Sequence, residues 1–323
     1  MVATNAGGIE AFRNGVMRHL ILGLEVVLAD GSVISDLKKV TKANEGYDVK
    51  QLFIGSEGTL GMITKISLSL VPLQEPSNTA LISCLSASKA ISLFRHLRNH
   101  RNLTLLSIEA MWPDYIHTVA KAVSLTNLLK FEQDPDAIYV LVDFCESQKQ
   151  TDNTLSYFES TLVDLIESEI VTNAIISKNQ KERDDMWRIR EDSFAVDDLY
   201  PHGFWFDMSV PLENLAAYAD GLEKRLQRIH GDIRLFLFAH LGDGNFHATI
   251  TTGYPMLELK DDIHAAVYDG LAEWGGSFSA EHGIGTDKRE SLNAYVPEVN
   301  RQLMETIKRA LDPKNIMNPG KVL

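Results

Sequence analysis

Three histidines and one glutamate in the last third of the chain have the types and spacing of a metal-dependent catalytic site. His240 and His247 begin and end the string HLGDGNFH, and Glu281 and His282 are adjacent in the string SAEHGIG at residues 279–285. Two imidazoles and one carboxylate suit a borderline divalent ion with open coordination positions, which a catalytic site needs. His282 would then lie beside the ion as a base that can move a proton.

The first two candidate ligands are predicted to lie on a hairpin. Residues 233–239 form an apolar run of β-forming residues that indicates a buried strand, and residues 246–250 resume as a second strand. Between them, residues 242–245 read Gly-Asp-Gly-Asn, which is typical of a tight turn. A hairpin brings its two ends together, so His240 and His247 can point at one ion.

The candidate acid comes from a separate element. A helix is expected at about residues 257–273 and a short strand at 274–279, directly before Glu281. Gly283 and Gly285 follow it and allow the backbone to approach closely. The alternative is that these histidines and this glutamate are ordinary polar residues satisfied by their neighbours, with no ion.

The two strings together resemble the signature motifs of the FAD-linked 2-hydroxyacid dehydrogenases, and the resemblance spans nearly the whole chain. In metal-dependent members the motif histidines and glutamate bind the ion, usually zinc, and the next histidine is the catalytic base. The resemblance therefore implies His240, His247 and Glu281 as zinc ligands and His282 as the base. It implies oxidation of a D-2-hydroxy acid, lactate-like, to the 2-oxo acid, with hydride passing to FAD and then to an unidentified electron acceptor.

Three glycine-containing strings resemble the family's flavin contacts. The string GSEGTLG at residues 55–61 has neither Rossmann nor P-loop spacing, and taken alone it reads as a turn into a strand. Taken alone, residues 3–8 read as a disordered terminus and residues 315–321 as a plain terminal loop. The residues that the resemblance places against FAD are Asn5, Gly7, Gly55, Ser56, Glu57, Gly58, Thr59, Gly61 and Asn318.

Arg190 is the candidate for binding the substrate carboxylate. It lies on a helix expected to open at residue 179, where a solvated arginine is the ordinary interpretation. In the family, the arginine of this Trp-x-x-Arg motif holds the carboxylate with its two-pronged guanidinium. Members that act on D-2-hydroxyglutarate have threonine, lysine and asparagine where this chain has Phe194, Trp205 and Thr249. We therefore expect a substrate with a smaller or more apolar side chain.

The predicted fold class is α+β in three segments. Residues 1–73 resemble the later lobe of a PCMH-type FAD-binding domain. Residues 74–290, which open with a linker-like stretch at 74–78, alternate between strands and helices and predict an antiparallel-sheet substrate and metal domain with helices on one side. Residues 291–323 are expected to form a C-terminal helix and a tail that returns to the flavin domain.

One departure from the family leads to an alternative function. Members begin with a lobe that carries the glycine-rich pyrophosphate loop, whereas this sequence starts where the second lobe should start. The alternative is a truncated or split subunit that is inactive alone and does not bind FAD without that lobe. A metal hydrolase on the same ligands is a third interpretation, although no nucleophile or oxyanion-hole motif accompanies them.

Composition restricts the partners. The 323 residues carry a net charge of −13, which argues against nucleic acid and against an anionic membrane surface, and requires a local basic pocket for an anionic substrate. Two cysteines provide no disulfide framework, so a reducing compartment is expected: the cytoplasm, or the mitochondrial matrix in a eukaryote. No apolar run reaches transmembrane length. A homodimer is a candidate assembly.

Overall fold

The structure is a computed model and describes residues 1–72, 78–146 and 156–323. It divides into two compact units, which are described separately. Unit 1 joins Met1–Leu73 with Ser279–Leu323, and unit 2 comprises Gln74–Phe278. Residues 279–290, which the sequence analysis assigned to the substrate domain, therefore pack with unit 1. The linker expected at residues 74–78 lies, apart from Asn78, outside the described residues.

Unit 2 is built on a seven-stranded sheet in which every neighbouring pair is antiparallel. The strand order is β7-β4-β6-β5-β9-β10-β8. The strands are β4 (Asn78–Cys84), β5 (Leu103–Met111), β6 (Ile138–Glu146), β7 (Asn173–Ile176), β8 (Phe204–Ser209), β9 (Arg234–His240) and β10 (Asn245–Thr251).

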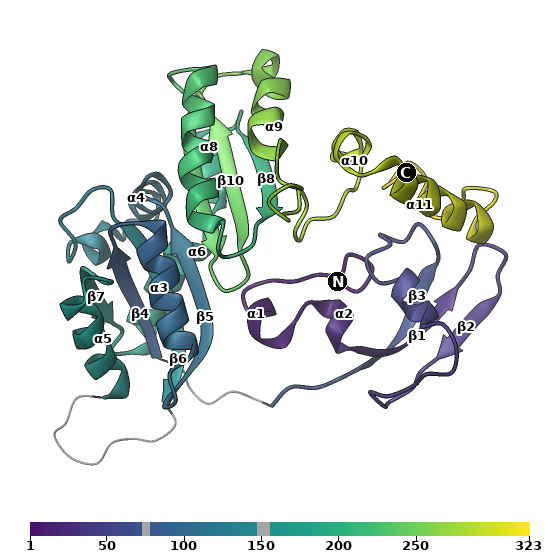
Figure 1. Cartoon of the computed structure of the whole chain (residues 1–323), viewed down its shortest axis with the longest axis horizontal. Coiled ribbons are helices and arrows are strands. Elements are labelled where there is room, and N and C mark those ends of the chain that lie inside the picture. The colour runs from purple at the N-terminus through teal and green to yellow at the C-terminus, as the bar shows by residue number, and fades with distance from the viewer. Residues whose placement is uncertain (73–77, 147–155) are drawn as a thin grey trace. The chain divides into compact units, whose positions relative to one another are not determined.

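Helices cover both faces of this sheet. On one face, Phe144 stacks on Phe158 of α5 and Phe246 packs against Tyr218 of α8, and α3 and α9 belong to the same layer (Figure 1). On the other face, Leu81 packs with residues of α4, α6 and α7. The helices are α3 (Ala87–Arg98), α4 (Pro113–Ala122), α5 (Tyr157–Glu167), α6 (Gln180–Glu191), α7 (Phe194–Leu199), α8 (Leu215–Ile229) and α9 (Lys260–Tyr268).

The α+β class with an antiparallel sheet is confirmed, but helices cover both faces of the sheet and not one face alone. The sequence analysis placed helices on one side, which describes the layer of α3, α5, α8 and α9. The second layer of α4, α6 and α7 explains why the central strands are buried along nearly their whole length. Part of this second face carries the polar cluster described below.

The predicted hairpin is confirmed as β9 and β10, which pair from Asn245 opposite His240 to Thr251 opposite Arg234. The backbone N–H of Gly244 donates to the carbonyl of His240 at 3.1 Å and closes the turn. Gly244 has φ +80°, and a β-carbon there would lie 2.1 Å from the carbonyl oxygen of Val210. Only glycine fits that position, so the turn and its register are specified locally.

Other elements are shorter than predicted. The helix expected at residues 257–273 is a turn of 3₁₀ helix, Leu257–Leu259, followed by α9. The chain turns at Gly270, whose φ of +80° cannot continue a helix. The strand expected at 274–279 is reduced to a single bridge between Ser277 and Ser209 of β8.

Unit 1 contains a three-stranded antiparallel sheet in the order β2-β1-β3. Its core gathers Leu24, Val26, Phe53 and Ile54, with Leu311 of the C-terminal helix packed against them. The elements of unit 1 are α1 (Ala11–Asn14), α2 (Met17–Leu20), β1 (Ile21–Val27), β2 (Val33–Asp36), a 3₁₀ turn at Val49–Leu52, β3 (Met62–Leu68), α10 (Arg289–Tyr295) and α11 (Glu298–Leu311).

The C-terminal segment is bonded to the N-terminal part of unit 1. Lys308 donates from Nζ to the carbonyls of Thr59 and Met317, both at 2.9 Å, and pairs with Asp312. Hydrogen bonds from Lys308 and from the backbone of residues 316 and 317 outweigh the effect of burial and lower the pKa of Asp312 to about 2. In the described part of the chain, no helix is long and apolar enough to cross a membrane.

Candidate functional site

The two hairpin histidines lie close together in unit 2. The ring centroids of His240 and His247 are 5.2 Å apart and the rings are perpendicular, with one ligand nitrogen from each within 4.8 Å of the other. His247 stacks on Phe238 at 4.9 Å between centroids. His240 is 7% exposed. Two imidazoles held in this way by a rigid hairpin are a fitting half of a divalent-metal site.

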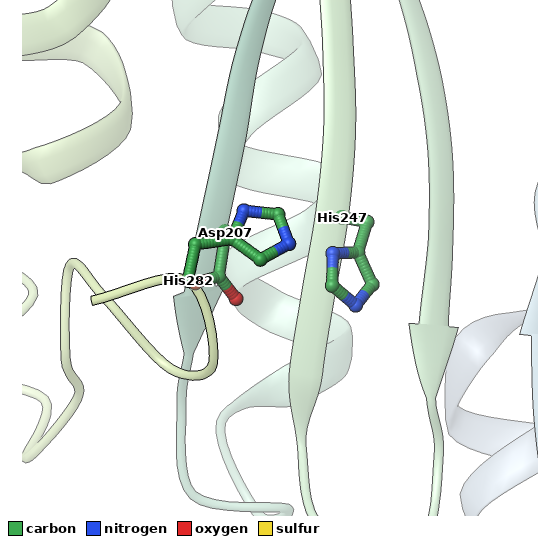
Figure 2. A group of neighbouring side chains, drawn as sticks. All are labelled: Asp207, His247 and His282. Atoms are coloured by element: carbon green, nitrogen blue, oxygen red, sulfur yellow. The ribbon is translucent and has the colours of Figure 1, made fainter. Parts of the chain in front are cut away.

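A buried acid stands opposite the second histidine. Asp207 of β8 pairs in register with His247 of β10, and one carboxylate oxygen lies within 4.8 Å of a ring nitrogen of His247 (Figure 2). Asp207 is fully buried and accepts a hydrogen bond from Nδ2 of Asn245 at 3.0 Å. The third side chain drawn there, His282, belongs to unit 1. Asp207 adds a negative charge beside the histidines, which favours a cation at this place.

Arg190 forms a buried ion pair instead of a solvated side chain. Its Nε donates to Oε2 of Glu109 at 2.8 Å and its Nη2 lies 2.5 Å from the same oxygen. Arg190 is 5% exposed and Glu109 is fully buried. The guanidinium also lies over the ring of Phe238 at 4.4 Å from the centroid. The arginine is therefore fixed by packing and charge on the face of the sheet that carries the histidines.

Glu109 also contacts the first histidine. Nδ1 of His240 lies 2.9 Å from Oε1 of Glu109, and Nη2 of Arg190 lies 3.4 Å from the same nitrogen. Below this group, the hydroxyl of Tyr115 donates to the carbonyl of Arg190 at 2.9 Å and holds the end of α6. Burial raises the pKa of that hydroxyl, so Tyr115 remains a donor.

The turn of the hairpin contributes a second acid. Burial raises the pKa of Asp243, although the nearby His240 acts in the opposite direction. The carboxylate accepts a hydrogen bond from the backbone N–H of Asn245 at 3.2 Å. Asp243 therefore stabilises the turn that sets the spacing of the two histidines.

Sequence reasoning missed Glu109 and Asp207. A signal for both was present, since each is a lone acid inside an otherwise apolar or aromatic strand, LTLLSIEAM and FWFDMS. A carboxylate in such a strand must be buried, and buried carboxylates need charged or hydrogen-bonding partners. The partners could not be named from the sequence because they lie on other strands and on α6.

Glu281 and His282 lie in unit 1, in a loop that Glu57 holds in shape. The carboxylate of Glu57 accepts hydrogen bonds from the backbone N–H groups of Ile284 at 2.7 Å and Gly285 at 2.8 Å. Gly283 has φ +76°, and a β-carbon there would lie 2.5 Å from Oε1 of Glu57. Gly283 is thus explained by the close approach of Glu57, and Gly285 by its own positive φ of +53°.

The residues predicted to contact FAD are brought together within unit 1. The backbone of residues 55–57 bonds to residues 2 and 3, through Gly55 N–H to Val2 at 3.2 Å and Glu57 N–H to Ala3 at 2.7 Å. Nδ2 of Asn318 donates to the carbonyl of Glu57 at 2.6 Å. The N-terminal, glycine-rich and C-terminal strings are therefore joined by hydrogen bonds, although they are far apart in the sequence.

Several of the residues predicted to contact FAD make hydrogen bonds or packing contacts within unit 1. Oδ1 of Asn5 accepts from the backbone N–H of Arg18, and Thr59 is buried with its hydroxyl on the carbonyl of Ser56. A β-carbon on Gly61 would lie 2.7 Å from Val26, so this glycine is needed for packing. At Gly58, whose φ is +73°, a β-carbon would lie 3.9 Å from Nδ2 of Asn318, so the backbone conformation and not a close contact favours glycine there.

Comparisons with known proteins identify the family. Residues 73–322 match the family described as FAD linked oxidases, C-terminal domain, and the chain belongs to it. It is 35% identical over 326 residues to a mitochondrial D-2-hydroxyglutarate dehydrogenase of Rattus norvegicus, covering 100% of this chain and 59% of that protein. It is 30% identical over 331 residues to a D-2-hydroxyglutarate–pyruvate transhydrogenase of Saccharomyces cerevisiae, covering 100% of this chain and 66% of that protein. The chain thus spans about three-fifths of the length of such relatives.

Solved structures support the same fold. A p-cresol methylhydroxylase with substrate bound has a TM-score of 0.66 at 15% identity, covering 99% of this chain and 68% of that one. An alkyldihydroxyacetonephosphate synthase has a TM-score of 0.64 at 16% identity, covering 98% and 56%. At this level of identity the likeness confirms the predicted fold of an FAD-linked oxidase.

Proposed function

We propose that the protein oxidises a D-2-hydroxy acid with an apolar, lactate-like side chain to the 2-oxo acid, using FAD and a divalent metal ion, zinc. The observation that carries the proposal is the buried group in unit 2, where His240 and His247 lie beside Arg190 on one face of the sheet. It combines ligands for a cation with a fixed guanidinium for a carboxylate, the two contacts that a 2-hydroxy acid needs.

Glu281 is proposed to complete the ligand set with His240 and His247. Chain connectivity supports this assignment: Ser277 is bridged to Ser209 in unit 2, and Glu281 follows only four residues later. Four residues span at most about 14 Å of extended chain. Two imidazoles and a carboxylate would leave coordination positions for a substrate oxygen.

The chain's own residues have separate roles in the proposed reaction. When bound, FAD would take up the hydride equivalent and the ion would lower the pKa of the substrate hydroxyl. Arg190 would pair with the substrate carboxylate through the part of its guanidinium directed away from Glu109. His282 would accept the hydroxyl proton. Asn5, Gly7, Gly55, Ser56, Glu57, Gly58, Thr59, Gly61 and Asn318 would form or shape the flavin surface in unit 1.

The proposed substrate class follows from three side chains. Phe194 and Trp205 are in aromatic contact, 6.3 Å between centroids, and Thr249 pairs opposite Trp205. Relatives named for D-2-hydroxyglutarate must accommodate a second carboxylate, and this aromatic group offers it no cation. We therefore favour lactate or a related acid with an apolar side chain.

The relatives also bear on where the protein is located and on whether this chain alone holds FAD. Several are named mitochondrial, so we propose the mitochondrial matrix if the source is a eukaryote. The alternative function is a subunit that is inactive alone and holds FAD only with a further lobe. The chain's coverage of 59% of the rat relative makes this alternative specific and testable.

The test is direct. The purified chain is examined for flavin absorption, supplied with FAD and Zn²⁺, and assayed with D- and L-lactate and D-2-hydroxyglutarate using an artificial electron acceptor. Oxidation of D-lactate in preference to its mirror image, lost after treatment with a chelator, supports the proposal. Colourless protein that binds Zn²⁺ but shows no turnover supports the subunit alternative, and protein with FAD and Zn²⁺ bound that oxidises no 2-hydroxy acid overturns the main proposal.

A further inference from the structure

One fully buried carboxylate joins the candidate metal ligand to the candidate substrate-binding arginine. Glu109 lies on β5 opposite His240 on β9. Its Oε1 is 2.9 Å from Nδ1 of His240, and its Oε2 accepts from Nε of Arg190 at 2.8 Å. These contacts lie within unit 2 and include residues from a strand, a hairpin and a helix.

The hydrogen-bonding capacity of the three groups fixes the tautomer of His240. An ionised carboxylate only accepts, and a guanidinium only donates. The 2.9 Å contact with Glu109 therefore requires a proton on Nδ1 of His240, while the 3.4 Å approach of Arg190 to the same nitrogen is long for a hydrogen bond. With the proton on Nδ1, a neutral imidazole carries its lone pair on Nε2, the nitrogen that can then bind a metal.

We infer that Glu109 is a positioning residue that selects the metal-binding tautomer of His240 and fixes Arg190 at the same time. Glu109 is fully buried, so water does not replace either contact. One carboxylate thereby couples the orientation of the metal ligand to that of the carboxylate-binding arginine. The inference rests on the proposed function, because it assigns Glu109 a purpose within that site.

Glu109→Gln tests this role with little change in shape. In glutamine one of the two carboxylate oxygens is replaced by an amide nitrogen that only donates, so Arg190 and His240 no longer each have an accepting oxygen of their own. Asp143→Asn is the matched control. Asp143 is also a buried acid on the same face of the sheet, bonded to α6 through Arg183 at 2.7 Å and Trp187 at 3.0 Å.

Zn²⁺ affinity, the urea midpoint and the tautomer of His240 are measured on the full chain. We expect Glu109→Gln to weaken Zn²⁺ binding about 10- to 100-fold, the usual range for a group that supports a metal ligand. Asp143→Asn should lower the urea midpoint and leave Zn²⁺ affinity at the wild-type value. Equal Zn²⁺ affinity in wild type and Glu109→Gln, or an equal loss in Asp143→Asn, would overturn the role of Glu109.

The tautomer provides a readout that requires no folded Glu109 variant. In metal-free wild-type protein labelled with ¹⁵N-histidine, the resonances of His240 are assigned by their loss in His240→Gln. We expect Nδ1 to carry the proton and Nε2 to show the shift of an unprotonated nitrogen. A proton on Nε2 would overturn the inference, whereas wild-type protein with the expected tautomer that binds no Zn²⁺ would overturn the proposed metal site.

Discussion

Trp205 on β8 pairs directly opposite Thr249 on β10. The next pair on the same face of the sheet is Asp207 and His247, since side chains two residues apart along a strand share a face. Phe194 contacts Trp205 from α7. Phe194, Trp205 and Thr249 are thus neighbours in space, and Trp205 and Thr249 lie about 7 Å along their strands from Asp207 and His247.

Replacing this aromatic group should change the substrate preference. In Phe194→Thr/Trp205→Lys, we expect the ratio of kcat/KM for D-2-hydroxyglutarate to that for D-lactate to rise roughly tenfold or more, because a new cation meets the second carboxylate. The ratio is measured in the FAD-loaded protein. Tyr254→Lys, on an exposed residue elsewhere in unit 2, is the control. An unchanged ratio would remove these side chains from the substrate site.

Loss of the proposed base should affect turnover much more than binding. We expect His282→Ala to lower kcat by roughly 10²- to 10⁴-fold, the usual contribution of a general base. Zn²⁺ content should stay at the wild-type level, because His282 is not among the proposed ligands. His202→Ala, on an exposed turn of unit 2, should have near-normal turnover. Near-normal turnover in His282→Ala would contradict the assignment.

Removing the metal should lower the thermal midpoint of the wild-type protein but not that of a variant that lacks a metal ligand. A ligand at 100 times its Kd stabilises the folded state by roughly 3 kcal/mol, so chelation should reduce the thermal midpoint of the Zn²⁺-loaded chain by several degrees. We expect the midpoint of His247→Ala to be insensitive to chelator. His96→Ala, exposed on α3, should respond like wild type. A midpoint that does not depend on Zn²⁺ in wild type would count against the metal site.

Asp197 should make stability depend on pH. Both carboxylate oxygens are buried without a hydrogen-bond partner among the described residues, and burial, then repulsion by Asp198, raises the pKa to about 6. Because the folded state binds this proton more tightly than the unfolded chain, whose pKa is near 3.8, stability is lost as pH rises from 3.8 through 6.

Asp197→Asn removes that ionisation. We expect it to raise the free energy of unfolding by roughly 1 kcal/mol at pH 7, a value discounted for partial exposure, and to bring no gain below about pH 4. Urea unfolding at several pH values measures the difference. The exposed Asp198→Asn should give a smaller gain. Equal stabilisation by Asp197→Asn at pH 4 and pH 7 would show that ionisation is not the cause.

The sequence was most informative where the determinants are local. The hairpin of His240 and His247 follows from alternation, apolar runs and a turn that only glycine permits at Gly244, so both strands were predicted. The helix expected to open at residue 179 is likewise found as α6, which begins at Gln180 with Asn179 as its N-cap. These features depend on residues close together in the chain.

Long-range partners could not be predicted. Glu109 is 81 residues from Arg190 and 131 from His240, and nothing in the intervening sequence specifies which strands become neighbours. A signal for the second helical layer was present in the continuous apolar run of β6 at residues 138–142, but such a run does not specify which helices cover each face. The contacts of Glu109 with Arg190 and His240 follow from the order of the strands in the sheet and not from the secondary-structure propensity of any segment.

The discontinuity of unit 1 has a consequence for biosynthesis. Strands β1 to β3 leave the ribosome before unit 2, whereas their partner helix α11 and the loop held by Glu57 are translated after it. Unit 2 can begin to collapse while synthesis continues, but the hydrogen bonds that Glu57 accepts form only after residues some 230 positions downstream are translated, as the separation between Glu57 and Gly285 shows. During that interval the apolar core of Leu24, Val26, Phe53 and Ile54 lacks the packing of Leu311.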